Sequence, residues 1–128
     1  MRPRSLFSST VAAENLLSPE QAKALADKVL SMAKADDTRV SISSDWSGNS
    51  RFAAGEITTS GETTDTTVSI VSTIGKRRAS ASTNILDDAS LRRTVELSER
   101  LAKRSPEDPE IMPELGSQTY SPVGGFIE

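Results

Sequence analysis

The stretch of sequence that decides the fold is 39–83, which reads RVSISSDWSGNSRFAAGEITTSGETTDTTVSIVSTIGKRRASAST. Apolar and polar side chains alternate over much of it, and Thr, Val and Ile, which suit a pleated surface, are abundant. Three short segments of turn-forming composition interrupt the pattern, at 47–50, 60–62 and 75–76. Because strands joined by tight turns pair antiparallel, this stretch predicts a meander of four strands, at 39–46, 51–59, 63–74 and 77–83, with Gly55 as a bulge or a point of close backbone approach in the second.

A helix is predicted on each side of the meander. The first begins at Ser18-Pro19-Glu20-Gln21, where Ser is a good N-cap, Pro suits the first helical position and Gln completes a capping box. It is expected to end near Lys34. The second is capped by Asp87 or Asp88 and ends before Ser105-Pro106. The predicted fold class is therefore α+β in the order α-β-β-β-β-α, with both helices packed on one face of a four-stranded antiparallel sheet.

The length of 128 residues fits one domain. Residues 18–105 carry the regular patterns, so we expect a flexible lead-in over 1–17 and an extended, Pro- and Gly-containing linker over 106–128. A net charge of −3 argues against a dedicated nucleic-acid binder, which usually carries a basic excess. No apolar run approaches the length of a membrane span, and the N-terminus lacks the apolar core of a signal peptide. We therefore expect a cytoplasmic protein without membrane or nucleic-acid partners.

The sequence contains no His and no Cys. Disulfides, thiol nucleophiles and His-dependent triads are thereby excluded, as are zinc sites built from imidazole or thiolate ligands. The paired carboxylates Asp36-Asp37 and Asp87-Asp88 are better explained by a loop and a helix cap than by acid–base chemistry. The basic turn Lys76-Arg77-Arg78 is interpreted as a solvated hairpin tip, because no aromatic residues are interleaved with it.

Four stretches resemble the N-terminal domain of the TldD/PmbA family, metal-dependent peptidases once described as modulators of DNA gyrase. They are ALADKVL at 24–30, SRFAAGEI at 50–57, GKRRASASTN at 75–84, and PEDP at 106–109 followed by MPEL at 112–115. The resemblance runs from about Ser18 onward. It departs from the family pattern at Ala54-Gly55, where the family often has Asn, and at Ala79, where it often has Gly. Each stretch is weak alone, and their shared order is more specific.

The resemblance implies a non-catalytic role for this chain within a peptidase. The family's zinc ligands, a His-Glu-x-x-x-His helix and a Cys, belong to a larger C-terminal domain, and no position here matches them. We therefore expect a partial chain that is inactive alone and holds no cofactor. Its expected partners are the catalytic domain, an unfolded peptide substrate and a second subunit in a homo- or heterodimer. Its candidate substrate-channel or domain-interface residues are Arg51, Phe52 and Glu56.

Two alternatives remain beside this hypothesis. The chain could be a stand-alone interaction module for a protein partner. It could also be an RNA-binding module, since double-stranded RNA-binding domains also pack helices on one face of an antiparallel sheet. That fold needs basic residues at the start of its last helix, where this chain has Asp87-Asp88. Trp46 is interpreted as a core residue, whereas Phe52 fits a core position and an interface position about equally.

Overall fold

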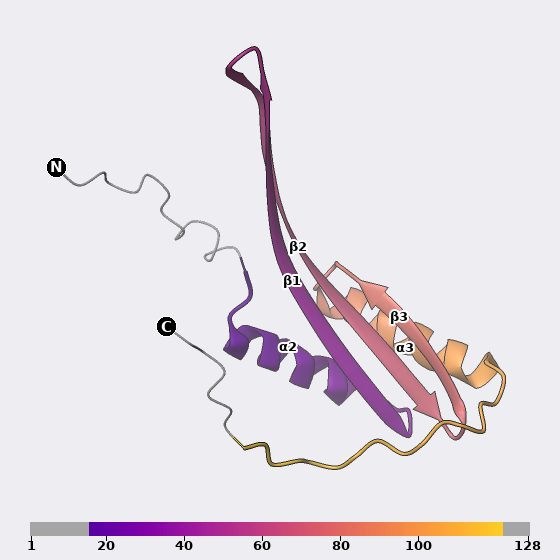
Figure 1. Ribbon diagram of the computed structural model, residues 1–128. Coiled ribbons are helices and arrows are strands. Elements are labelled where there is room, and N and C mark those ends of the chain that lie inside the picture. The colour runs from indigo at the N-terminus through magenta and orange to yellow at the C-terminus, as the bar shows by residue number, and fades with distance from the viewer. Residues whose placement is uncertain (1–15, 122–128) are drawn as a thin grey trace.

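The computed structural model describes residues 16–121 and contains two helices and three strands over that range. The expected lead-in therefore lies outside the described residues except for its last two, and so do the last seven residues of the expected linker. The strands pair antiparallel in the order β1-β2-β3 (Figure 1), which is an α+β arrangement as predicted. In chain order the elements are α2 (Pro19–Met32), β1 (Asp37–Ala53), β2 (Glu56–Ile74), β3 (Arg77–Thr83) and α3 (Asp88–Arg104).

The prediction of four strands was wrong, because the expected first and second strands are one. β1 continues through the segment 47–50, and β2 continues through 60–62 directly opposite it, where Gly48 pairs with Glu62 and Ser50 with Ser60. The chain reverses instead at Ala54-Gly55, the residues with positive φ (52° and 81°) between the two strands. Positive φ at both central residues is typical of a two-residue type I′ hairpin turn, so Gly55 lies in the turn rather than in a bulge.

One irregularity does interrupt the β1–β2 pairing. Arg51 pairs with Thr59 and Phe52 pairs with Ile57, so Thr58 is an additional residue on β2. Such a bulge increases the local twist of the hairpin near its end. The third predicted turn is confirmed: Gly75, with φ 57°, begins the reversal from β2 to β3.

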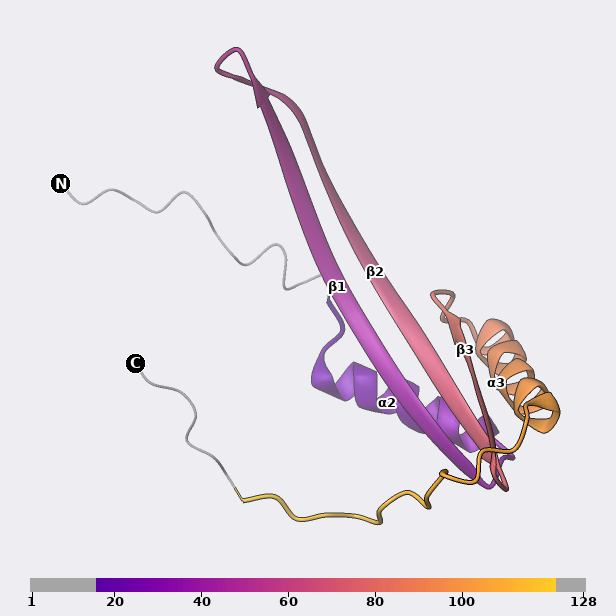
Figure 2. The ribbon, with the colours of Figure 1, turned by 45° about the vertical axis from the view of Figure 1, so that its right-hand side comes forward.

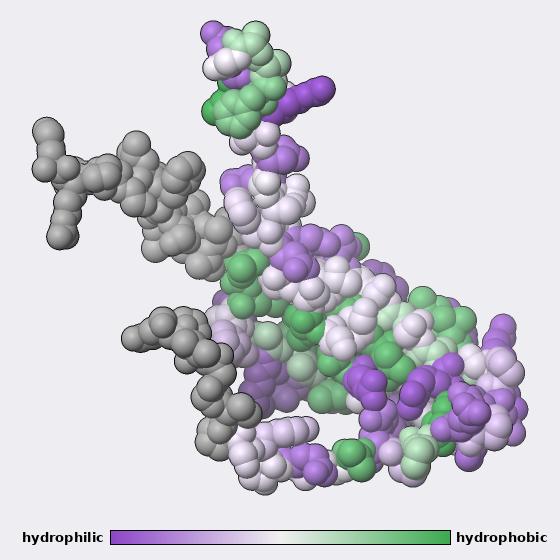
Figure 3. Space-filling view, in the orientation of Figure 1, coloured by the Kyte–Doolittle hydropathy of each residue, from purple (hydrophilic) through white to green (hydrophobic). Residues whose placement is uncertain are grey.

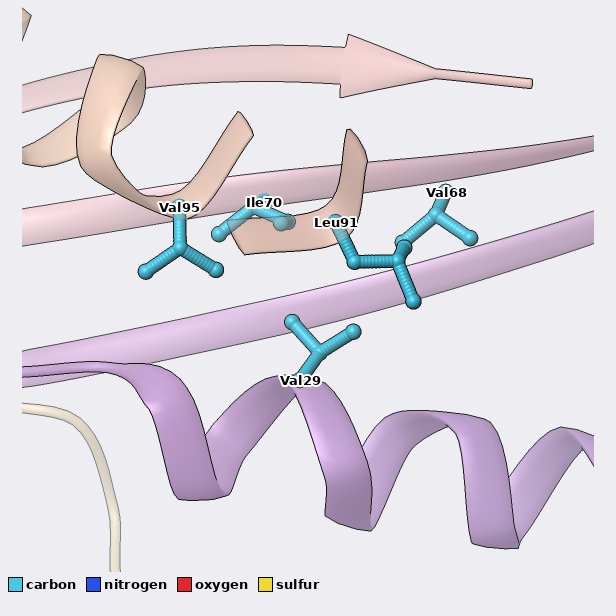
Figure 4. Close-up of a cluster of buried hydrophobic side chains, with 5 residues drawn as sticks. All are labelled: Val29, Val68, Ile70, Leu91 and Val95. Carbon is cyan, nitrogen blue, oxygen red and sulfur yellow. The ribbon is translucent and has the colours of Figure 1, made fainter. Parts of the chain in front are cut away.

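Both helices pack on the same face of the sheet, as the apolar stripes predicted. The buried residues of β2 on this face alternate, and their β1 partners Val40 and Ile42 complete the sheet side of the core. α2 and α3 each contribute apolar side chains to the same cluster (Figure 4). The five residues at its centre, each at most 1% exposed, are Val29, Val68, Ile70, Leu91 and Val95.

Side-chain oxygen atoms cap both helices at the predicted positions. Ser18 Oγ accepts from the amide of Gln21, whose side chain accepts from the Ser18 amide, so the capping box is formed. Asp87 accepts from the amide and hydroxyl of Ser90, and these hydrogen bonds hold the pKa of Asp87 below its usual range. Lys28 of α2 forms an ion pair with Asp88, which joins the two helices. α2 ends at Met32, two residues before the predicted end.

The helices and β3 cover only about half of the β1–β2 hairpin. The other half, residues 45–65, projects away from the core (Figures 1 and 2), and every residue in it is exposed. We call residues 45–65 the arm. At about 3.3 Å per residue, the nine residues from Asp45 to Ala53 extend over roughly 30 Å. A two-stranded ribbon of this kind is marginally stable in water by itself, and the covered half of the same hairpin anchors it.

A buried hydroxyl pair in the core provides the first test of this packing. Ser98 Oγ donates to the Val95 carbonyl at 2.8 Å, so the 2.7 Å contact between Ser72 Oγ and Ser98 Oγ is donated by Ser72. Both residues are 0% exposed. Ser98→Ala leaves the Ser72 hydroxyl without a partner and is expected to reduce the free energy of unfolding by about 1–3 kcal/mol. The double variant Ser72→Ala/Ser98→Ala is expected to recover most of that loss.

Urea denaturation of the wild type, both single variants and the double variant measures this coupling. Arg92→Ala, on the exposed face of α3, is the control and should change stability little. Additive effects of the two serine substitutions would contradict the buried pair, because independent sites do not compensate each other.

Candidate functional site

The three candidate residues from the sequence lie together at the end of the arm. Arg51 pairs with Thr59, Phe52 with Ile57, and Glu56 with Ala53, so all three flank the turn that closes the hairpin. All three are exposed, and Phe52 is 68% exposed. The core alternative for Phe52 therefore does not hold in this structure. The arm places these residues at the point of the described chain farthest from the helices (Figure 2).

One side of the arm carries exposed aromatic side chains. Alternation along β1 places Trp46, Gly48, Ser50 and Phe52 on the same side as the core residues Val40 and Ile42. No helix covers this side beyond residue 44 in the described chain, and Trp46 is 41% exposed while Ile57, paired with Phe52, is 62% exposed. Figure 3 shows the hydrophobic side chains gathered at the end of the arm, above a more polar middle section. The side of the sheet that is apolar in the core thus continues uncovered to the turn, with apolar side chains at Trp46 and at the Phe52–Ile57 pair and polar residues between them.

Trp46 lies on the arm, so the prediction of a core tryptophan was wrong. Its ring packs along the strand over Gly48, where an added Cβ would approach the ring Cη2 to 2.8 Å. Gly48 therefore supplies the space in which the indole lies flat against the ribbon. A shallow hollow surrounds the ring, lined by Trp46, Gly48, Asn49, Ser50, Ser60, Gly61 and Glu62. Aromatic surface beside exposed backbone polar groups is suited to contact with a polypeptide.

The arm also has two strand edges that no other described strand covers. β3 pairs with β2 only over Val68–Ile74, so the outer edge of β2 is unpaired from Glu56 to Thr67 within residues 16–121. β1 is the outermost strand on the other side over its whole length. Unpaired edges present rows of N–H and C=O groups that can add another extended chain.

A second cluster, which the sequence did not predict, holds the segment after α3. Lys76 Nζ donates to the Pro109 carbonyl, and the Lys76 carbonyl accepts from the amide of Asp108, each at 2.7–2.8 Å. Arg77 donates to the Ser105 carbonyl at 3.1 Å and forms an ion pair with Glu107 at 3.2 Å. The basic turn is therefore an anchor for the chain, and its interpretation as a purely solvated tip was incomplete. Because the partners are far apart in sequence, local composition gave no signal of this role.

Glu114 fixes the same segment farther along. Its carboxylate forms ion pairs with Arg39 of β1 and Arg78 of β3, and the hydrogen bond from Arg39 is the main cause that lowers the pKa of Glu114 below its usual 4.5. The segment 105–114 thereby passes the core end of the sheet, which is the end opposite to the arm (Figure 1). It encloses a hollow with the sheet, lined by Asp36, Asp37, Thr73, Gly75, Lys76, Arg78, Ile111, Met112, Pro113 and Glu114. Asp36 accepts from the Gly75 amide at 2.7 Å, which gives this carboxylate a structural role.

The residues of this chain do not fit a zinc site. His and Cys are absent from the sequence, and within residues 16–121 no three acidic side chains come together in a way that could hold a metal ion. No helix in the described range combines the length and apolar character needed to cross a membrane.

Comparison with known proteins gives an informative match to a solved structure. No family model matches the chain, and no curated protein matches by sequence. Among solved structures, TldE from Thermococcus kodakarensis matches with a TM-score of 0.56 and 15% identity, over 81% of this chain and 24% of TldE. This chain has a TldD/PmbA-like fold. The similarity that four short stretches indicated is confirmed for the fold. The matched region spans about a quarter of the length of TldE.

Removal of the Glu114 carboxylate tests the anchored segment. Glu114→Gln is expected to accelerate amide exchange over 108–115 and to leave exchange in the strands unchanged, because the charge-assisted contacts to Arg39 and Arg78 are lost. In the wild type the protection should be present above pH 4.5 and decrease as the pH falls through the lowered pKa of Glu114. Hydrogen exchange followed by mass spectrometry measures both effects.

Glu110→Gln is the matched control, since it removes the same charge from a neighbouring exposed position of the segment. Equal exchange in the Glu114→Gln variant and the wild type would show that the segment is held without these ion pairs.

Proposed function

We propose that this chain is a non-catalytic domain of a TldD/PmbA-like metal-dependent peptidase. In this proposal it walls a cavity and guides unfolded peptide toward a metal site on another domain. The observation that carries the proposal is the similarity to TldE, which covers 81% of this chain but only 24% of TldE. The remaining three-quarters of such a protein leaves room for a catalytic domain. The absence of His and Cys from this chain agrees with the proposal that the metal ligands belong to another domain.

The arm supports the guiding role. An extended peptide that pairs with the free outer edge of β2, over 56–67, would lie in line with β3, whose pairing with β2 ends at Thr83 opposite Val68. Backbone hydrogen bonds would then hold the peptide with little dependence on its sequence. Ile57 and the Trp46 face would offer apolar contact to alternate side chains of the peptide. Such a mode suits a protein that receives unfolded chains of varied composition.

The end of the arm is the proposed contact with the catalytic domain. Arg51, Phe52 and Glu56 combine an exposed aromatic ring with both signs of charge, which is the composition of an interface anchor with a polar rim. The segment 105–114, fixed by the basic turn and Glu114, would set the direction in which the chain proceeds to the next domain. A dimeric assembly and a cytoplasmic location complete the proposal.

A stand-alone interaction module is the second candidate, because the exposed arm would serve any protein partner equally well. RNA binding has less support. The net charge is −3, and the start of α3 carries Asp87 and Asp88 where phosphate contacts would need cations. The binding experiment below separates RNA binding from contact with a polypeptide.

Trp46 is the single tryptophan of the chain, so its fluorescence reports on the arm alone. Titration with an unfolded, tryptophan-free polypeptide is expected to give a saturable blue shift, as the half-exposed indole loses water. Ile57→Ser, which removes apolar surface beside the free edge of β2, is expected to weaken binding by about tenfold or less. The chelator EDTA should leave binding unchanged, and the peptide should remain intact.

Leu97→Ser on α3 is the control, because Leu97 is 37% exposed but distant from the arm in sequence and in fold. No shift with polypeptide would refute the guiding role. A shift with a duplex RNA at low salt, abolished by moderate salt, would favour the RNA-binding alternative. Chelator-sensitive hydrolysis by the purified chain would refute the non-catalytic assignment.

A further inference from the structure

The arm carries the whole net negative charge of the chain. Residues 45–65 contain four acidic side chains and one basic side chain, and their net charge of −3 equals that of all 128 residues. The rest of the chain is therefore balanced in charge. A polypeptide that lies along the arm meets a negative field, which favours a cationic chain over an acidic one. The charged residues of the arm are Asp45, Arg51, Glu56, Glu62 and Asp65.

Glu62 is the acidic residue that borders the tryptophan. It pairs with Gly48 across the ribbon, and the six-membered ring of Trp46 lies over Gly48, where an added Cβ would approach Cη2 to 2.8 Å and Cζ2 to 3.0 Å. Trp46 and Glu62 both line the shallow hollow of the arm. Asp45 and Asp65 pair with each other one position away from Trp46, so alternation places them on the opposite side of the ribbon.

The carboxylate of Glu62 and the indole of Trp46 are both available to a ligand. Glu62 is exposed and has no ion-pair partner within residues 16–121. Trp46 is 41% exposed, with one face of the ring turned toward Gly48. The face of an indole attracts a cation, and a guanidinium that stacks on it can also donate hydrogen bonds to a neighbouring carboxylate. The hollow thus combines the two groups that recognise a cationic side chain.

The position of this hollow selects for a long side chain. A peptide paired with the outer edge of β2 lies one strand beyond Glu62 and two strands beyond Gly48. Because neighbouring strands are about 4.8 Å apart, the backbone of the peptide is roughly 10 Å from that of Gly48. Arg and Lys carry their charge at the end of long apolar stems, which can pass beside Glu62 toward the indole. A short side chain does not reach the ring.

We propose that the hollow beside Trp46 binds an Arg or Lys side chain of an extended peptide, stacked on the indole and paired with Glu62. This inference rests on the proposed function, because it names cationic peptides as the class that the free edge of β2 receives. Arg is favoured over Lys, since its planar group stacks on the ring and its fork of N–H groups matches a carboxylate. Gly48 is a positioning residue, because it holds the ring flat without touching the ligand.

Isothermal titration calorimetry with matched peptides tests this preference. The peptides have blocked termini and Thr at every second position, and the positions between carry Arg, Lys, Gln or Glu. The Arg peptide is expected to bind roughly threefold to tenfold more tightly than the Gln peptide, with Lys between them and Glu weakest. A peptide with 2,4-diaminobutyrate, whose ammonium group is two methylene groups nearer the backbone than that of Lys, should bind more like the Gln peptide.

Variants of the arm separate the site from the general field. Glu62→Gln is expected to weaken the Arg peptide about threefold and to leave the Gln peptide unchanged. Asp65→Asn, the matched control, removes the same charge from the other side of β2 and should have a smaller effect on the Arg peptide. Trp46→Leu should reduce the preference for Arg over Lys, since Leu offers no ring to stack on. Gly48→Ala should do the same, because the added Cβ displaces the ring.

Each failure has its own signature. Equal binding of the Arg, Lys and Gln peptides would overturn this inference and leave the guiding role intact, whereas no binding of any peptide would refute both. Equal weakening by Glu62→Gln and Asp65→Asn would show that the field of the arm acts without a site, and would also overturn the inference. A neutral oligosaccharide that shifts the Trp46 fluorescence, with no preference among the peptides, would assign the hollow to sugars instead.

Discussion

The continuous antiparallel pairing of β1 with β2 is the constraint on which the rest of this structure depends. It runs from the Asp37–Thr73 pair to the Arg51–Thr59 pair without interruption. One half of this hairpin forms the sheet that α2 and α3 cover, and the other half becomes the arm. Because side chains alternate along both strands, the side of the sheet that buries Val68 and Ile70 continues onto the arm, where Trp46 and Phe52 lie on it exposed. The pairing register of β1 with β2 therefore fixes both the buried side chains of the core and the exposed aromatic side chains of the arm.

The exposed arm and the anchored C-terminal segment lie at opposite ends of this hairpin. The core end carries the basic turn, which fixes the chain after α3 through backbone carbonyl groups and Glu107, while Glu114 joins Arg39 and Arg78. The distal end carries the exposed ring and free edges. A domain with this arrangement can keep its connection to a neighbouring domain fixed while the arm contacts a substrate or a second subunit.

Local sequence signals predicted the helices, their caps and the antiparallel character of the sheet, because Ser18, Asp87 and the apolar stripes act within one or two turns of chain. The strand count was wrong for a physical reason. Gly48 and Gly61 suggest turns by composition, but neither has positive φ, and the actual reversal uses Ala54-Gly55, where the common Asn-Gly signal is absent. Residues 51, 52 and 56 were expected on a single strand but flank the turn between β1 and β2, and their function stays a prediction. The Glu114 contacts could not be foreseen, since their partners are 36 and 75 residues away.

The central claim is that residues 45–65 form one hairpin arm rather than two short strands with turns at 47–50 and 60–62. NMR cross-strand contacts measure this directly. The account predicts nuclear Overhauser effects between the backbone protons of the facing pairs Ser50–Ser60 and Gly48–Glu62, together with a reversal at Ala54-Gly55. Contacts that close a turn within 47–50, with no contact between residues 50 and 60, would restore the four-stranded meander and contradict the arm.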